Sequence, residues 1–390
     1  MSPPSPIPAL EGADPFRAVA AAHAPLAITT RGSILESAHV GSVAVVDLDG
    51  RLLGGAGNPW HRTATRSALK PFQAVPFVAA AGLERFGYST QHAALLCASH
   101  SGEPRHVELV AAILRRAGNS PEDLQCGTQA PGFYDARGEV PPPPPYSPLA
   151  HNCSGKHSGM LAYCVQCGVD KADYLDYDHP LQRAIRAAVA HCLETPESEL
   201  QAGVDGCSAP NYAVPLGRLA LGYARLAADA DDPRYGRTLE RLGSAMREHP
   251  ELVSGEGRSD LALMRAGRGD WVTKVGAEGV QGIGVRSRGI GIAIKVADGS
   301  KRALYPAVVA VLDQLGLLDS DQRQALAAWR TPAIRNYRGF VTGEVRPVVE
   351  VLAPACLPGG TPTSGQPPPP PLSATEPPAG ERSSLQPDAR

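Results

Sequence analysis

The sequence predicts an α/β fold in which early and late strands share one sheet and a helical region is inserted between them. Three observations support this prediction. Strand-like segments alternate with turns between residues 26 and 53, apolar residues recur at helical spacing from residue 67 onward, and β-rich segments return after residue 270. Since a sheet must cover its apolar face with another layer, this order suits helices packed on a sheet built from both parts of the chain.

The elements follow from local patterns. The apolar run 43–46 and the turn residues 47–50 predict a strand that enters a hairpin. Helices are expected at 67–83, 105–117, 181–193, 216–228 and, near the end, 303–315. Late strands are expected at 271–275 and 290–296. The glycines from 276 to 291 indicate strand–turn–strand rather than a phosphate loop, because no Gly-Lys-Ser/Thr ends the run.

Composition limits the class of protein. The 390 residues, 43% of them hydrophobic, suffice for a large core in one large or two ordinary domains. A net charge of −2 without a basic stripe argues against a nucleic-acid partner or an acidic membrane surface. No apolar run is long enough to cross a membrane, and the first residues lack the pattern of a signal peptide. We therefore expect a cytoplasmic protein.

Low-complexity segments suggest the domain boundaries. Residues 1–14 and 354–390 are rich in Pro, Ser and Gly, so we expect a disordered N-terminus and a disordered tail. The catalytic domain is expected at 15–353, with a stiff five-proline insert at 141–145. In such a chain the eight cysteines indicate buried thiols, metal ligands or nucleophiles rather than a disulfide framework.

The first candidate site is Ser67-Ala68-Leu69-Lys70. A serine hydroxyl needs a base within hydrogen-bond reach, and Lys70 lies nearly one helical turn from Ser67. Lysine can be that base when burial or a neighbouring charge such as Arg66 lowers its pKa. The start of a helix also offers N–H groups to an oxyanion. The alternative interpretation is a capped helix with a solvated lysine.

Two further motifs extend this site. In serine hydrolases of the β-lactamase type, S-x-x-K is paired with a later K-T-G on a strand. Lys274-Val275-Gly276 matches this motif incompletely, since valine replaces the threonine. The turn around Ser99 and His100 brings a second serine and an imidazole, or else it caps the next helix.

Three residues form a candidate metal site. Cys153 and Lys156 lie one helical turn apart, and Cys207 supplies a second thiol from a later turn. Two thiolates can bind zinc, and a neutral lysine is a rare further ligand. Spacing alone does not establish the site. The pair at 164 and 167 is expected to face the core of a helix.

Together these motifs resemble the zinc-binding, rhizobial-type (class 3) L-asparaginases of the asparaginase II family. The resemblance covers about residues 24–350 and rests on short motifs whose combination is specific. They are R-S-A-L-K-P at 66–71, C-A-S-H-S-G-E at 97–103, N-C-S-G-K-H at 152–157, D-G-C at 205–207 and K-x-G-A-E-G at 274–279.

The resemblance implies a β-lactamase/penicillin-binding-protein-like fold and hydrolysis of L-asparagine to L-aspartate and ammonia. It pairs Ser67 with Lys70 and Ser99 with Lys274 around the substrate, and it implies a homodimer. The implied zinc ligands are Cys153, Lys156 and Cys207, and the residues assigned to substrate binding are Arg66, His100 and Asp205. The alternatives are a β-lactamase-like esterase or peptidase, and a catalytically inactive zinc-stabilised binding protein.

Overall fold

The computed structural model describes residues 21–357. Its strands are β1 (Ala24–Arg31), β2 (Ile34–Asp47), β3 (Leu52–Ala56), β4 (Arg62–Ala64), β5 (Gln201–Val204), β6 (Pro210–Pro215), β7 (Trp271–Gly276), β8 (Val280–Val285), β9 (Ile290–Val296), β10 (Ala333–Arg335) and β11 (Val341–Pro347). Its α-helices are α2 (Lys70–Gln73), α3 (Val75–Ala79), α4 (Gly82–Arg85), α5 (Thr90–Leu96), α6 (Pro104–Arg116), α7 (Gly132–Arg137), α8 (Ser154–Cys167), α9 (Pro180–Cys192), α10 (Leu216–Ala227), α11 (Thr238–Glu248), α12 (Pro250–Val253), α13 (Ser259–Ala266), α14 (Lys301–Gln314), α15 (Ser320–Ala325) and α16 (Ala327–Arg330). Short 3₁₀ helices are η1 (Arg66–Leu69), η2 (Pro121–Asp123), η3 (Pro148–Ala150), η4 (Glu197–Glu199), η5 (Arg286–Arg288) and η6 (Pro354–Cys356).

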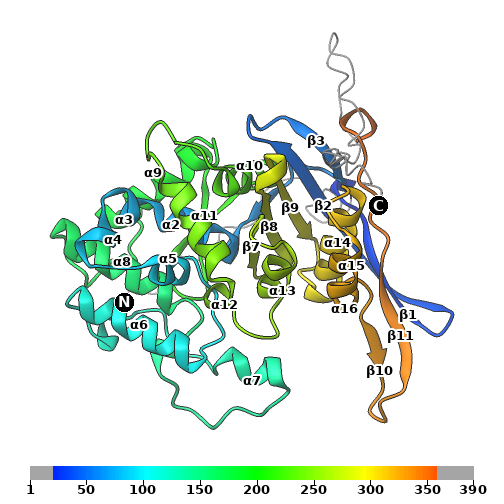
Figure 1. Cartoon of the computed structure of the whole chain (residues 1–390), viewed down its shortest axis with the longest axis horizontal. Helices are drawn as coiled ribbons and strands as arrows, with labels where there is room; N and C mark the ends of the chain where they lie inside the picture. Colours follow the sequence, from blue (N-terminus) through cyan, green and yellow to red (C-terminus); the bar gives the residue numbers. More distant parts are fainter. Residues whose placement is uncertain (1–20, 358–390) are drawn as a thin grey trace, which may run out of the picture.

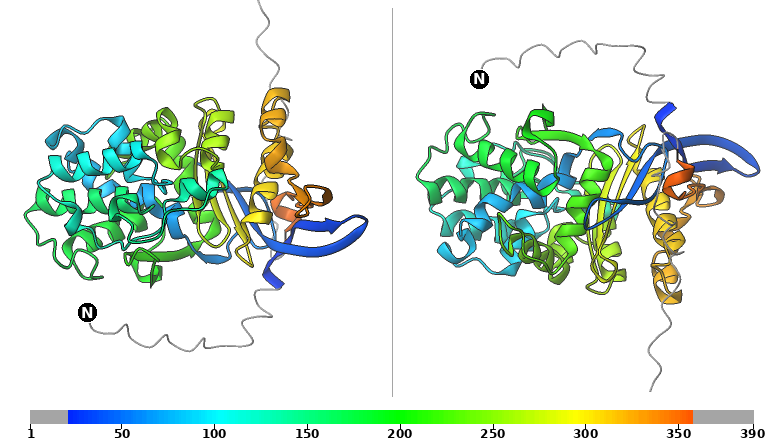
Figure 2. Two further views of the ribbon diagram at one scale, coloured as in Figure 1. Left: turned by 90° about the horizontal axis from the view of Figure 1, so that it is seen from below. Right: turned by 90° about the horizontal axis from the view of Figure 1, so that it is seen from above.

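One eight-stranded antiparallel sheet joins the early and the late strands. Its order is β10-β11-β1-β2-β9-β8-β7, with β3 paired to β2. The pairing of β2 with β9 sets Ala44 opposite Ala293, so segments some 250 residues apart lie side by side. Helices α2 to α9 lie to one side of this sheet, and the β1–β2 and β10–β11 hairpins project at the opposite end (Figure 1; Figure 2). The predicted α/β architecture is confirmed.

Both faces of the central strands are buried. Successive residues of a strand point to opposite faces, so Val43 and Val45 join the core under α14, whereas Ala44 and Val46 join the core under α10. This explains why the central strands show continuous apolar runs instead of alternation.

Glycines in the late strands let α10 approach the sheet closely. A Cβ on Gly291 would lie 1.8 Å from the carbonyl oxygen of Ala220, and one on Gly284 would lie 2.1 Å from that of Tyr223. A glycine in a strand interior commonly marks such a close backbone approach. The expected strand–turn–strand arrangement of this segment is confirmed as β7, β8 and β9.

The helix expected at 67–83 does not form as one piece. The segment instead forms η1, α2, α3 and α4 in succession. Pro71 and Pro76 occupy the first turns of α2 and α3, where a missing N–H is tolerated, and Ala81 adopts a left-handed conformation at φ 59°. The other expected helices agree with α6, α9, α10 and α14 to within about two residues, which is the usual uncertainty of helix ends.

The predicted terminal segments lie mostly outside the described residues. The expected N-terminal segment 1–14 is not described, and of the expected tail only 354–357 is, where η6 forms and the side chain of Leu357 is buried. In α8, Cys164 faces the core as expected, but Cys167 is exposed. Among residues 21–357, every helix is too short or too polar to cross a membrane.

Candidate active site

The candidate residues converge from five separate segments of the chain. Arg66 and Ser67 lie on η1, and Lys70 begins α2. Ser99 and His100 follow α5, whereas Cys153 precedes α8 and Lys156 lies on its first turn. Asp205 and Cys207 lie between β5 and β6, and Lys274 lies on β7. The end of β7 packs against η1, since a Cβ on Gly276 would lie 2.7 Å from the carbonyl oxygen of Thr65.

The backbone just before Ser67 is strained and firmly held. Arg66 has φ 49°, which a non-glycine residue adopts only when its surroundings enforce it. The side chain of Asn211 supplies that restraint: its Oδ1 accepts from the Arg66 N–H at 2.9 Å, and its Nδ2 donates to the Arg66 carbonyl at 3.0 Å. The Arg66 guanidinium donates to Asp205 Oδ1 at 2.8 Å. Ser67 is partly exposed, and its hydroxyl forms no hydrogen bond to any described residue.

Lys70 is buried and donates to Ser99. Its Nζ lies 2.9 Å from Ser99 Oγ, 2.6 Å from the carbonyl oxygen of Ala98 and 3.3 Å from that of Asn152. Ser99 itself is only 4% exposed. The structure therefore joins Lys70 to the second serine by a direct hydrogen bond, where the resemblance implies a pairing with Ser67.

Lys274 and Asp260 form a fully buried ion pair. The Lys274 Nζ lies 3.5 Å from Asp260 Oδ2 and donates to the carbonyl oxygen of Val275 at 2.7 Å. Burial lowers the pKa of Lys274 to about 8, although Asp260 opposes the shift. The Asp260 carboxylate also accepts from Thr273 Oγ1, Gln281 Nε2 and the Val275 N–H at 2.9–3.1 Å. A lysine with this pKa is partly neutral near neutral pH, so it can accept a proton.

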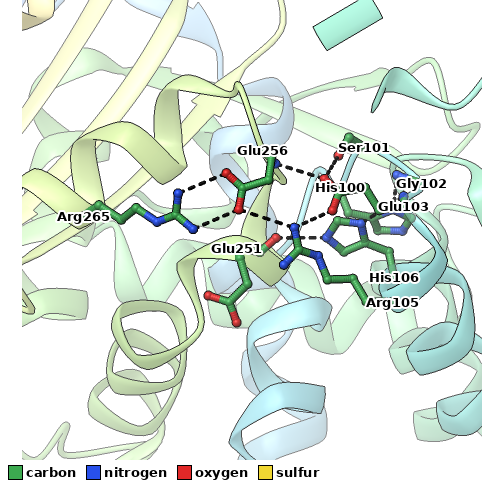
Figure 3. A network of polar contacts seen from close by, with 9 residues as sticks. All are labelled: His100, Ser101, Gly102, Glu103, Arg105, His106, Glu251, Glu256 and Arg265. Atoms are coloured by element: carbon green, nitrogen blue, oxygen red, sulfur yellow. Dashed lines mark hydrogen bonds and ion pairs between the residues drawn. The ribbon is translucent and has the colours of Figure 1, made fainter. Parts of the chain in front are cut away.

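His100 is completely buried, and both of its ring nitrogens are engaged. Nδ1 accepts from the Gly102 N–H at 3.2 Å, and Nε2 lies 2.9 Å from Ser154 Oγ. Burial holds the pKa of His100 well below its usual value, so the ring is neutral. His100 also stacks on His106 at 5.0 Å between ring centroids (Figure 3). In this arrangement His100 positions the loop, and its own ring nitrogens are not free for a ligand.

Two thiols and an amine meet beside the serines. The Lys156 Nζ lies 3.0 Å from Cys207 Sγ, and all three side chains of Cys153, Lys156 and Cys207 are buried. A hydrogen bond with Cys207, helped by nearby Lys70 and Lys156, holds the pKa of the Cys153 thiol well below its usual value. Burial lowers the pKa of Lys156, but Cys207 and Cys153 together raise it. The Cys153 sulfur thus carries thiolate character at neutral pH.

This donor set fits zinc in type and burial. Two sulfurs and one nitrogen would leave a fourth position open, as in sites where zinc also holds water. Within residues 21–357 no three His, Cys, Asp or Glu side chains gather as metal ligands, so any site here depends on lysine as a ligand. The Asp205 carboxyl lies close by: burial raises its pKa, but Lys156, the Gly206 N–H and Arg66 lower it below its usual value.

Comparison with known proteins decides the family. The family model described as L-asparaginase II matches residues 27–347, which run from β1 to β11. The chain belongs to the L-asparaginase II family. It is therefore an asparaginase-type amidohydrolase, and its substrate is a small molecule.

Two further comparisons add little. No curated protein matches the chain. Among solved structures, a putative β-lactamase from Bacteroides dorei DSM 17855 is similar at 13% identity and a TM-score of 0.36, covering 70% of this chain and 93% of that one. The similarity is too low to support an argument, so the fold description of this L-asparaginase II family member rests on its own sheet topology.

Sequence reasoning missed two residues of this family member's site. Asp260, the buried partner of Lys274, lies in a helix whose pattern marks only an ordinary amphipathic segment. Asn211 restrains Arg66, but in the sequence it is only a polar residue within a strand. An acid followed after 14 residues by a strand lysine is no recognisable local signal, because the contact exists only once α13 packs beside β7.

Proposed function

We propose that this protein hydrolyses L-asparagine to L-aspartate and ammonia through an ester on Ser67. The observation that carries the proposal is the difference between the two serines. Ser67 is partly exposed and its hydroxyl is unpaired among the described residues, whereas Ser99 is buried and receives a hydrogen bond from Lys70. A nucleophile must be reached by its substrate, and a buried serine suits proton relay better.

The chemical steps then assign a role to each group. Ser67 Oγ attacks the side-chain carbonyl carbon of asparagine, and its proton passes into the network of Lys70, Ser99 and Lys274. The C–N bond breaks, the nitrogen takes up a proton, and ammonia leaves. Water then hydrolyses the ester, which releases aspartate and restores Ser67. Lys274 suits the role of proton acceptor, since burial lowers its pKa to about 8.

Arg66 and Asp205 are proposed to face the polar end of the substrate. They form an ion pair beside Ser67, at 2.8 Å, and Asn211 fixes the backbone of Arg66. The Asp205 carboxylate can accept from the substrate ammonium group, and Arg66 holds that carboxylate in place through their ion pair. His100 is proposed to act through the loop that it orders, because both of its nitrogens are already engaged.

We further propose that Cys153, Lys156 and Cys207 hold zinc. Bound there, the metal would tie the segment before α8 to the turn between β5 and β6, both of which border the site. Lys156 must lose its proton to bind a metal. The support for this site is the burial and proximity of the three side chains, together with the family resemblance.

A homodimer and a cytoplasmic location complete the proposal. Apolar side chains stand exposed on the projecting hairpins, among them Ile34, Leu35, Tyr337 and Phe340. Exposed apolar side chains of this size are common in contact surfaces, and a second copy of the chain is their proposed partner. Light scattering should give twice the mass of one chain, and a monomer at high concentration would contradict the dimer.

The decisive experiment combines hydrolysis with detection of the ester. Purified protein should release ammonia from L-asparagine, and a rapid acid quench followed by intact-mass spectrometry should show an aspartyl adduct on Ser67. Ser67→Ala should lose both. An adduct that persists in Ser67→Ala would reverse the roles of the two serines, whereas turnover of nitrocefin or simple esters without asparagine hydrolysis would indicate the β-lactamase-like alternative.

A further inference from the structure

Positive charge accumulates around the two serines without matching acids. Lys70 and Lys274 are buried there, and the guanidinium of Arg258 is close enough to lower the pKa of Lys274 further. Asp260 is the acid that faces Lys274, and it is already committed to that lysine and to three hydrogen bonds. The thiol of Cys153 is a further group that raises the pKa of Lys274. Like charges in a partly desolvated site repel one another unless an anion joins them.

Arg258 is the member of this group that a ligand could reach. It is half-buried at the N-cap of α13, and within residues 21–357 its guanidinium forms no ion pair or hydrogen bond with a side chain. The side chain extends over the start of α7, where a Cβ on Gly132 would lie 3.3 Å from its Nη1. The same Cβ on Gly132 would lie 3.6 Å from the Cα of Ser101, which places the Arg258 guanidinium on the side of the Ser99 loop.

The segment that carries Arg258 is clamped to the Ser99 loop. The Ser99 N–H donates to the carbonyl oxygen of Val253 at 2.9 Å, and the Glu256 N–H donates to Glu103 Oε1 at 2.9 Å. Gly255 adopts φ 116°, and a Cβ there would lie 1.9 Å from Ser101 Oγ. Only glycine allows so close an approach.

Charged side chains reinforce this clamp from outside (Figure 3). The Arg105 guanidinium donates to Glu103 and lies 3.6 Å from Glu256, and Arg265 binds Glu256 through two hydrogen bonds of 2.9 and 3.0 Å. The neighbouring acids are thereby occupied by arginines other than Arg258. The segment is therefore ordered, while the Arg258 guanidinium has no side-chain partner among the described residues. This is the arrangement of a pre-organised anion site.

We propose that Arg258 binds the carboxylate of the amino-acid substrate and thereby selects free amino acids over their neutral amides. This inference rests on the proposed asparaginase reaction and adds a specificity residue to it. A planar guanidinium matches a carboxylate through two parallel hydrogen bonds. The bound carboxylate also offsets the repulsion among Arg258, Lys274 and Lys70. It therefore stabilises the site both through its hydrogen bonds to Arg258 and through this reduced repulsion.

The test compares two substrates that differ only in this charge. L-asparagine carries the α-carboxylate, and L-asparagine amide replaces it with a neutral carboxamide. Arg258→Gln should raise KM for L-asparagine by about 10- to 100-fold, because a charge-assisted pair is lost, and should change KM for the amide far less. Arg258→Lys should recover part of the loss. Arg268→Gln is the matched control, since Arg268 is exposed beyond the end of the same helix and pairs with Asp319.

Direct binding separates this inference from the proposed reaction. Isothermal titration with L-aspartate should show binding to the wild type that weakens at least about tenfold in Arg258→Gln. Wild-type protein that binds L-aspartate in this way but never hydrolyses L-asparagine would refute the reaction and keep the carboxylate site. Unchanged L-aspartate affinity in Arg258→Gln, equal losses for both substrates, or no binding of L-aspartate to the wild type would each overturn the role of Arg258.

Discussion

Replacing Asp260 by asparagine should shift the pH dependence of hydrolysis toward acid. If neutral Lys274 accepts the proton, then a pKa of about 8 leaves about a tenth of the molecules competent at pH 7 and about nine-tenths at pH 9. For the wild type, kcat/KM should therefore rise about tenfold from pH 7 to pH 9. The groups that face Lys274 are Asp260, Lys70, Arg258 and Cys153, and of these Asp260 is its direct partner.

The size of the shift follows from the ion-pair distance. Two unit charges 3.5 Å apart interact by about 5 kcal/mol at an effective dielectric constant of about 20, which sets an upper limit of about 3.5 pH units. Because the surroundings relax in the variant, we expect the pKa of Lys274 to fall by about 1 to 3 units. The sign is fixed: loss of the anion disfavours the charged lysine, so the lysine becomes neutral at lower pH and the activity plateau is reached earlier.

The assay is ammonia release from L-asparagine between pH 5 and pH 9.5, with kcat/KM taken from full substrate curves. Asparagine at 260 offers only one oxygen, so either the Val275 N–H or the Thr273 and Gln281 donors lose their acceptor at a cost of about 1–3 kcal/mol, and a thermal melt of the variant must accompany each profile. Asp313→Asn, which removes an acid bound to Arg323 and Arg330 away from the site, is the control and should leave the profile unchanged. A flat wild-type profile between pH 7 and 9, or a plateau that moves to higher pH in Asp260→Asn, would refute the assignment of Lys274.

The remaining predictions address the relay, the metal and the clamp. Ser99→Ala should slow turnover by about 100-fold or more while a slow adduct on the nucleophile remains, and adduct formation at the wild-type rate would exclude a relay role. Protein never exposed to chelator should contain about one zinc per chain by elemental analysis, and Cys207→Ser should contain much less; zinc-free wild type would contradict the site. Gly255→Ala should lower the free energy of unfolding by about 3–5 kcal/mol from backbone strain and overlap with Ser101, whereas Gly138→Ala, at φ 67° with open space around it, should cost only about 1 kcal/mol in the same urea titration.

Local pattern predicted several of the longer elements because periodicity is a property of a few consecutive residues. The helix expected at 303–315 formed as α14 even though Pro306 lies inside it, since its apolar stripe packs on the sheet. The helix expected at 67–83 did not form as one piece, because Pro71 and Pro76 each favour a new first turn. That break matters for the site, since it places Ser67 on the short helix η1 rather than on a long one.

The sequence predicted which residue types form the site better than it predicted which side chains pair with each other. Motifs near Ser67, Ser99 and Lys274 pointed to one site, and β7 does pack against η1 in the structure. The partner of Lys70 was not predictable, because a lysine side chain is long enough to reach either neighbouring serine. It is the packing of the loop after α5 that brings the Ser99 hydroxyl to 2.9 Å from Lys70 Nζ.

The sequence by itself indicated the order of strands, a helical middle and returning strands, and it indicated the family, since each of these depends on short runs of residues. Only the tertiary structure decided which charges are paired. Asp260 neutralises Lys274, and the neighbours of Arg258 are bound elsewhere, because residues distant in the chain meet in the folded protein. Burial then lowers the pKa of Lys274, and burial is a property of the packed core that no local pattern contains.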